Sequence, residues 1–309
     1  MPLPEPSSST PATTVRPARD GEHLPPDVPP LRPSSDDPWR RSLVAERDGV
    51  AVGTATIALA AVTDTYFCEV HVTEPLRRQG IGTELYRAAC TAAARPLPVI
   101  GRAMGSQPLR RQFAESIGCE VAVHCPEPWA DPTTEPWRRW IDEHPVPAGY
   151  RVAPVREHDP AAVEAAWSSY FTWSHTPFGD VRTERLPQAW LRYSAGLDRD
   201  LSMVASDAHG QPVALSLVSP DVWDGRTLVV SETVQRDQPA GTTLLQAVVA
   251  ASLRVLGQRG TRLVELEGHS TDTHSPELVA SLPPHEADPM DLLRLRRLPG
   301  TPAAVGAGR

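Results

Sequence analysis

The sequence predicts an α+β fold with two tandem domains, each a mixed, mostly antiparallel sheet flanked by helices. Two observations predict it. Short extended segments separated by turn signals alternate with stretches of helical periodicity, in the same order in both halves of the 309-residue chain. Matching points also keep a constant spacing, since Val204 follows Val44, and Val234 follows Val72, by about 160 residues. This spacing indicates a duplicated domain.

The first half opens with a hairpin. Ser42–Arg47 and Val50–Leu59 are predicted strands, and Asp48-Gly49 between them is a strong signal for a two-residue turn. A third strand covers about Thr65–Val72. Apolar stripes and their stop signals then predict a helix over Gly82–Arg95, a strand over Val99–Met104 and a helix over Pro108–Ile117.

The second half repeats this plan. The repeated elements are strands over Leu201–Ser206, Val213–Val218 and Leu228–Val234, a helix over Thr242–Leu256 and a strand over Thr261–Leu266. An aromatic cluster at Trp167–Trp173 precedes them. It favours a helix packed on its sheet, with a cage for a cationic ligand as the alternative.

Proline marks the boundaries. The chain has 34 prolines, about twice the usual share, and they gather where long helices cannot form. We therefore expect a disordered tail over residues 1–12, a first domain over 13–127, a linker over 128–148, a second domain over 149–298 and a disordered tail over 299–309.

Charge and composition exclude several classes of protein. The net charge is −8, so the chain lacks the basic footprint of a nucleic-acid-binding protein. All 30 basic residues are arginine, which excludes a Schiff-base lysine and a phosphate-loop lysine. No apolar stretch approaches the ~20 residues that span a bilayer, and the sequence MPLPEPSSST is unlike a signal peptide. We expect a cytoplasmic bacterial protein that does not bind membranes.

The 4 cysteines show no metal-binding spacing. Cys68, Cys90, Cys119 and Cys125 form no C-x-x-C pair, and no histidine cluster lies beside them. We expect free thiols and no metal.

The segment with the clearest chemistry runs from Val72 to Leu85, where a strand ends and a helix begins. The first turn of a helix offers backbone N–H groups without internal partners, and the helix dipole adds positive charge there. Gly80 and Gly82 leave the backbone open to a bulky anion, and Arg77 and Arg78 can contact phosphate. This segment predicts a pyrophosphate cradle.

These residues resemble the GCN5-related N-acetyltransferase (GNAT) superfamily. The pattern R-x-x-G-x-G is present as Arg77, Gly80 and Gly82, and the family's late helix and glycine match Phe113 to Gly118. The resemblance covers about residues 42–122 and implies a sheet splayed at its fourth strand, with acetyl-CoA in the splay. It implies pantetheine pairing at Val70 and Val72, and pyrophosphate on the amides of Gln79, Gly80, Ile81, Gly82 and Thr83.

The whole chain resembles tandem members of this superfamily from actinobacteria, including mycothiol-synthase-like proteins. The second half matches them through Ser231–Val234, but Pro239, Thr242 and Leu244 replace the cofactor-binding positions. We expect the second domain to bind no CoA and to shape the acceptor pocket. The general-acid tyrosine of the family is replaced by Ala114, and a proline-rich segment replaces its two acceptor-site helices.

Direct transfer needs a group that accepts the proton of the amine. Glu69 is the first candidate, with His71 and Asp64 as alternatives, and strand alternation puts Glu69 and His71 on one face. Asp64 and Glu232 are candidates for binding the acceptor. A plain surface or ion-paired carboxylate is the competing interpretation for Glu69 and for Glu232.

These residues predict an N-acetyltransferase that transfers the acetyl group of acetyl-CoA to a primary amine of a small molecule. The alternative is a non-catalytic acyl-CoA-binding or regulatory module, which the alanine at position 114 favours. A purely structural tandem domain is the third hypothesis. We expect a monomer or a homodimer, and we leave the identity of the acceptor open.

Overall fold

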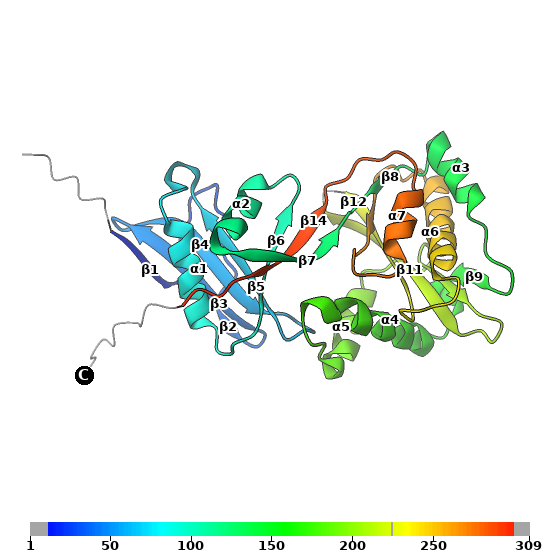
Figure 1. The fold of residues 1–309 in the computed structure, drawn as a ribbon, viewed down its shortest axis with the longest axis horizontal. Helices are drawn as coiled ribbons and strands as arrows, with labels where there is room; N and C mark the ends of the chain where they lie inside the picture. Colours follow the sequence, from blue (N-terminus) through cyan, green and yellow to red (C-terminus); the bar gives the residue numbers. More distant parts are fainter. Residues whose placement is uncertain (1–11, 224, 300–309) are drawn as a thin grey trace, which may run out of the picture.

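The computed structural model describes residues 12–223 and 225–299 (Figure 1). An eight-stranded sheet and a six-stranded sheet, each flanked by helices, lie end to end along the long axis of the molecule. The α+β class with two tandem domains is confirmed. The expected tails lie outside the described residues, apart from Ala12 and Pro299.

The first sheet has the strand order β1-β3-β4-β5-β6-β14-β7, with β2 beside β3. Its strands are β1 (Thr13–Pro17), β2 (Ser35–Asp36), β3 (Trp39–Arg47), β4 (Val50–Leu59), β5 (Tyr66–Val72), β6 (Val99–Met104), β7 (Cys119–Cys125) and β14 (Met290–Leu295). The predicted hairpin turn is confirmed, because Asp48 and Gly49 have φ values of 50° and 78°. A two-residue turn needs this left-handed backbone to match the twist of its strands.

Two helices cover one face of the first sheet. They are α1 (Ile81–Ala92) and α2 (Pro108–Ile117), and a short 3₁₀ turn, η1 (Glu74–Leu76), precedes α1. Leu85 and Ala89 of α1 are fully buried against Ala55 and Ile57 of β4. The predicted bounds of α2 are confirmed, whereas α1 ends three residues before the predicted Arg95.

The second sheet has the strand order β8-β13-β12-β11-β10-β9. Its strands are β8 (Trp129–Ala130), β9 (Arg151–Pro154), β10 (Met203–Ser206), β11 (Pro212–Trp223), β12 (Arg226–Thr233) and β13 (Val264–Glu267). The helices on one face are α3 (Glu135–Glu143), α6 (Gly241–Gln258) and α7 (Ser275–Ser281). On the other face lie α4 (Pro160–His175) and α5 (Leu186–Ser194), with the 3₁₀ turns η2 (Val155–Glu157), η3 (Thr176–Phe178) and η4 (Thr183–Arg185) nearby.

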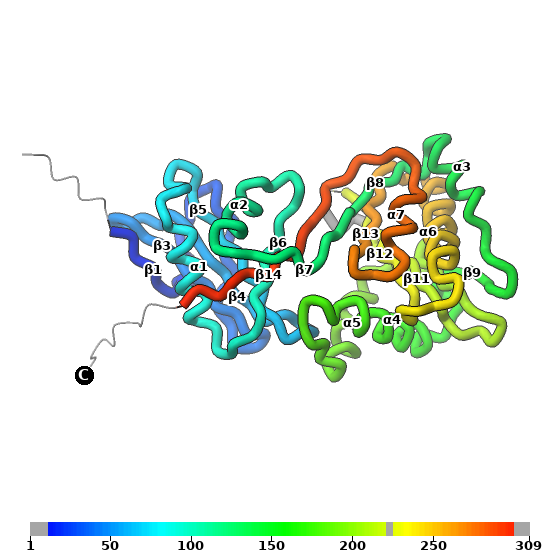
Figure 2. Tube along the Cα trace, in the orientation of Figure 1, coloured from blue at the N-terminus to red at the C-terminus, as the bar shows by residue number. Residues whose placement is uncertain are grey.

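The two domains exchange strands. β14 pairs antiparallel with both β6 and β7, so the end of the chain completes the first sheet (Figure 2). β8, which follows β7 along the chain, pairs with β13 of the second sheet. The predicted boundary of the second domain at residue 298 is therefore wrong for residues 290–295, because a local pattern does not reveal which sheet a strand joins.

The segment predicted as a linker, residues 128–148, packs into the second domain. Trp137, Trp140 and Ile141 of α3 are buried in the same core as α6, since α3 is strongly amphipathic. The linker thus forms a layer of the second domain. None of the helices in residues 12–223 and 225–299 has the length and apolar composition needed to cross a bilayer.

Candidate functional site

The first domain has an opening where β5 and β6 separate. The two parallel strands pair only at Tyr66 with Val99 and at Phe67 with Ile100. Beyond these pairs they diverge, and a cavity of about 580 Å³ fills the space between β5, β6 and α2. The sheet is therefore splayed at the strand that the sequence singled out.

The edge of β5 offers backbone groups to this cavity. The amide of Tyr66 donates to Pro98 on the β6 side, and the amide of Thr73 donates to Val52 on the β4 side. Because successive residues of a strand point their amides to opposite edges, the N–H and C=O groups of Cys68, Val70 and Val72 face β6. An extended amide chain can pair with this edge as an added strand does.

The start of α1 forms one end of the cavity. Gly80 is the N-cap residue, and the amide of Glu84 makes the first intrahelical hydrogen bond to its carbonyl. The amides of Ile81, Gly82 and Thr83 precede this bond and so have no intrahelical acceptor. They lie at the positive end of the helix dipole, which attracts anions.

The two glycines of this turn serve different needs. Gly80 has φ of 83°, and a Cβ there would meet nothing within 4 Å, so the backbone conformation requires it. Gly82 lies against α2, since a Cβ at this position would come within 3.2 Å of the Phe113 ring. Close packing of α1 on α2 thus requires a residue without a side chain at position 82, which leaves the backbone amides of the first turn of α1 uncovered.

Four guanidinium groups line the cavity. They belong to Arg77, Arg78, Arg102 and Arg110, and Glu69 is the sole carboxylate among the described lining residues. Arg77 folds back over the strand, with its Nε donating to the carbonyl of Val72 over 3.0 Å. This charge suits a ligand that carries phosphate groups.

Most of the predicted site residues are brought together here. The cavity lining includes Glu69, Val70, His71, Val72, Arg77, Arg78, Gly80, Gly82 and Thr83. Gln79 and Ile81 do not line it with their side chains. Gln79 accepts a hydrogen bond from Arg47 over 2.8 Å, and Ile81 is buried in the core.

Glu69 is exposed and His71 is half-buried, on the face of β5 opposite the Cys68 side chain. Burial lowers the pKa of His71 below its ordinary value of 6.5, and the positive charge of Arg110 lowers it further. The imidazole is therefore neutral at pH 7 and can accept a proton. Burial raises the pKa of Cys68, so that thiol stays protonated and is a poor nucleophile.

The structure does not bring Asp64 or Glu232 into this cavity. Asp64 forms ion pairs with Arg95 over 3.1 Å and with Arg182 over 3.6 Å, where the two domains meet. Glu232 lies in a separate pocket of the second domain and is only 3% exposed. Neither of these two candidates for binding the acceptor lines the cavity that contains Glu69, because their neighbours come from other parts of the chain.

In the second domain, the start of α7 covers the first turn of the matching helix, α6. Ala240, with φ of 58°, is the N-cap residue of α6 and so corresponds to Gly80. Counting along the sequence placed this correspondence two residues later, at Thr242. A Cβ at Gly241 would collide with the ring of His274. Thr242 donates to Glu277 over 2.7 Å. These side chains occupy the place where an anion would bind.

Sequence reasoning missed two arginines of the cavity, Arg110 of α2 and Arg102 of β6. Arg110 lies one turn before Phe113 and Ala114, which also line the cavity. Their i, i+3, i+4 spacing was a usable signal. Ala114 is 5% exposed, at the position where the resemblance implies a tyrosine.

Comparisons with known proteins agree with this geometry. Residues 12–104 match the model of the acetyltransferase (GNAT) family. A GCN5-related N-acetyltransferase from Sphaerobacter thermophilus superposes with a TM-score of 0.58 at 20% identity, over 84% of this chain and 82% of that one. A tandem GNAT protein from the clavulanic acid biosynthesis pathway superposes with a TM-score of 0.56 at 19% identity, over 83% of each chain.

A glucosamine N-acetyltransferase region of a fungal multi-domain β-N-acetylglucosaminidase also superposes, with a TM-score of 0.58 at 12% identity, over 93% of this chain and 38% of that one. The comparison with curated proteins finds no match. The match over residues 12–104 carries the GNAT signature, and the whole chain has the tandem GNAT fold.

Proposed function

We propose that the chain is an N-acetyltransferase that moves the acetyl group of acetyl-CoA to a primary amine of a small molecule by direct attack. The observation that carries the proposal is the cavity between β5 and β6, which joins an open strand edge to a bare helix N-terminus. A pantetheine arm needs the first feature and a pyrophosphate needs the second.

Acetyl-CoA would lie along this cavity. Its pyrophosphate would accept hydrogen bonds from the amides that begin α1, with Arg77 and Arg78 supplying charge-assisted contacts. Its pantetheine amides would pair with the β6-facing groups of Val70 and Val72. The thioester would then lie near Val70, beside the face that carries Glu69 and His71.

The chain supplies two elements of transfer chemistry at that point. The N–H of Val70 can donate to the thioester carbonyl and stabilise the charge that develops there. His71 or Glu69 can take a proton from the ammonium group of the acceptor, so that the neutral amine attacks the thioester carbonyl and CoA leaves as its thiolate. Attack by the amine itself is favoured over an acyl-cysteine route, because burial holds the neighbouring Cys68 thiol in its protonated form.

A non-catalytic acyl-CoA-binding or regulatory module is the second candidate. Ala114 favours it, since this side chain lies in the cavity and cannot protonate a leaving thiolate. The two candidates share the cofactor site and differ only in turnover.

Calorimetric titration with acetyl-CoA tests the cofactor site. Wild-type protein should bind one equivalent. Gly82→Leu should weaken binding more than tenfold, because its side chain would cover the open amides and press on Phe113. Thr242→Leu places the same side chain at the corresponding turn of α6 and should leave binding unchanged. No binding by the wild type, or equal loss in both variants, would refute the assignment.

Release of CoA thiol across a panel of small amines separates the candidates. Turnover with any primary amine supports the transferase. Tight binding without release across the panel supports the module. The resemblance to mycothiol-synthase-like proteins remains a prediction. A monomeric or homodimeric state also remains a prediction.

A further inference from the structure

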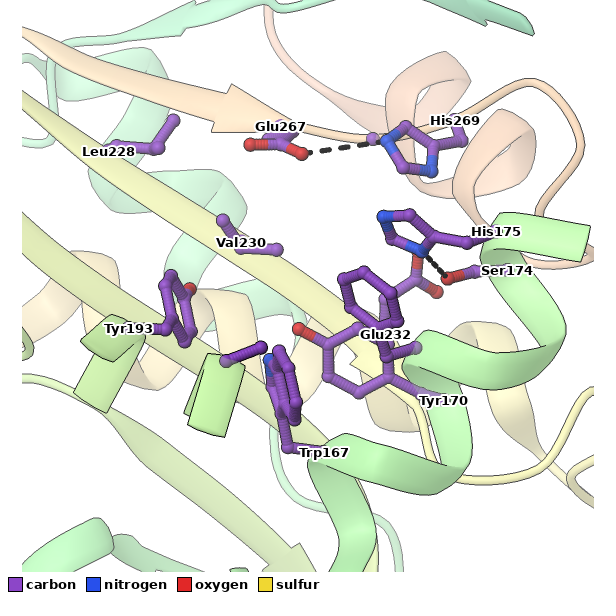
Figure 3. A pocket seen from close by; sticks show the side chains of 13 residues that line it. Trp167, Tyr170, Ser174, His175, Tyr193, Leu228, Val230, Glu232, Glu267 and His269 are labelled. Carbon is purple, nitrogen blue, oxygen red and sulfur yellow. Dashed lines mark hydrogen bonds and ion pairs between the residues drawn. The ribbon is translucent and has the colours of Figure 1, made fainter. Parts of the chain in front are cut away.

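The second domain has a pocket of its own. A cavity of about 250 Å³ lies between α4 and α5 on one side and β12 and β13 on the other (Figure 3). It shares no lining residue with the cavity between β5 and β6. Four rings and two carboxyl groups dominate its wall, namely Trp167, Tyr170, Phe171, Tyr193, Glu232 and Glu267.

Glu232 is the most unusual group of this wall. Alternation along β12 turns Leu228, Val230 and Glu232 to the same face, so a carboxyl stands where an apolar side chain would pack. Glu232 is 3% exposed, and its carboxyl lies against the buried Asp272 carboxyl, with which it can share a hydrogen bond only while one of the two holds a proton. Without that proton two negative charges would be buried side by side, and a cation bound beside them would offset this cost.

The rings form a surface that suits a cation. Trp167 stacks with Tyr193 at 5.9 Å between ring centroids and lies 4.9 Å from Phe171. Figure 3 shows Trp167 and Tyr193 on the helical side of the pocket, across from the strand that carries Val230. The face of an aromatic ring attracts a cation, most strongly for tryptophan.

The pocket offers no arginine that could pair with an anion. Its ionisable lining includes Glu232 and Glu267, and no arginine is among the described lining residues. His175 and His269 lie 5.6 Å apart, and burial, with His269 adding to it, lowers the pKa of His175. In the described part of the chain no group of three or more His, Cys, Asp or Glu side chains is placed to hold a metal ion.

We propose that this pocket binds a small organic ammonium ion, with the charged nitrogen beside Glu232 and its alkyl groups against the rings of Trp167 and Tyr193. The site lies apart from the cavity of the first domain, since none of its residues lines that cavity.

Binding should release a proton. Burial raises the pKa of Glu232 well above its ordinary value, and the hydrogen bond and charge of Asp272 and the charge of Glu267 raise it further, so Glu232 holds its proton to higher pH than an ordinary carboxyl does. Tyr170 and His175 from α4 also face this region, and neither brings a positive charge. A bound cation takes the place of the proton, so the affinity should rise with pH by up to about tenfold per unit.

Titration with choline and n-butylammonium, followed by calorimetry and tryptophan fluorescence, tests the proposal. Both ions should bind, and 3,3-dimethylbutan-1-ol, the uncharged isostere of choline, should bind at least tenfold more weakly. Trp167→Phe should remove most of the fluorescence change. Failure of both ions to bind at millimolar concentration, or equal binding of the alcohol, would overturn the proposal.

Glu232→Gln provides the matched variant. It keeps the shape of the side chain and should abolish binding of both ions without lowering the melting temperature, because the amide of the new side chain can donate to the Asp272 carboxyl. Glu164→Gln removes a carboxylate from α4 outside the pocket and should bind like the wild type. A folded Glu232→Gln protein that still binds the ions would contradict the proposal.

Discussion

His71 is the residue whose surroundings best fit a general base. It lies in the cavity beside Val70, and burial together with Arg110 lowers the pKa of its imidazole. Glu69 shares its face but is exposed. A proton acceptor must be unprotonated. A lowered pKa therefore lets His71 stay neutral at pH 7 and also at a somewhat lower pH, where an ordinary histidine is charged.

We predict that His71→Gln lowers kcat by about 10²-fold, the usual contribution of a positioned base, while the KM for acetyl-CoA changes little. The rate of the wild type should be constant at neutral pH and should fall on the acid side, below pH 6.5, as His71 gains its proton. Rates measured from pH 5 to pH 9 check this. If Glu69→Gln removes the acid limb and His71→Gln keeps it, the roles are reversed.

The local motif of the site was predictable, and its distant partners were not. Arg77, Gly80 and Gly82 lie within one strand-to-helix turn, whose geometry follows from the residues themselves. The surroundings of Asp64 and Glu232 could not be predicted, because their burial and pairing depend on residues more than 30 positions away, such as Arg95 and Asp272.

Among the elements, β6 and α2 match their predicted bounds because proline and glycine delimit them. Pro98 precedes β6, Pro108 begins α2, and Gly118, with φ of 84°, ends it. β7 was missed because its side chains do not alternate cleanly between buried and exposed. A register shift in its pairing with β14 interrupts the pattern.

The open edge of β5 gives a prediction at this scale. Val70→Pro removes one N–H that faces the cavity and no hydrogen bond to β4, so the sheet should tolerate it as an edge position does. We expect the Kd for acetyl-CoA to rise about tenfold, the effect of one lost hydrogen bond, with a small change in melting temperature.

Two variants serve as controls for the β5 edge. Val70→Ala keeps the N–H and should bind acetyl-CoA like the wild type. Glu69→Pro removes a hydrogen bond to β4, because residue 69 pairs with Thr56, and should unfold at a lower temperature. Normal binding by a folded Val70→Pro protein would show that the cofactor does not pair with this edge.

At the scale of the whole molecule, the exchanged strands make the two domains interdependent. β14 separates β6 from β7, and the residues after it fasten α1, since Tyr86 donates to the carbonyl of Arg296 over 3.1 Å and Arg297 donates to the carbonyl of Cys90 over 2.9 Å. Asp291 of β14 pairs with Arg111 of α2 and with His124 of β7. The cavity between β5 and β6 therefore depends on residues near the end of the chain.

A chain that ends at Pro289 should lose acetyl-CoA binding, although its cofactor loop is intact. The truncation removes Leu292, Leu293 and Leu295, which are 6%, 1% and 7% exposed, and each buried leucine contributes about 1.5–3 kcal/mol. Their sum is comparable with the whole stability of a typical domain. A chain that ends at Pro299 keeps β14 and should bind normally. Because β14 pairs on both sides, a synthetic peptide of residues 289–299 should restore binding to the shorter chain. Calorimetry with acetyl-CoA measures both the loss and the rescue. Full binding without the peptide would show that the first domain folds alone.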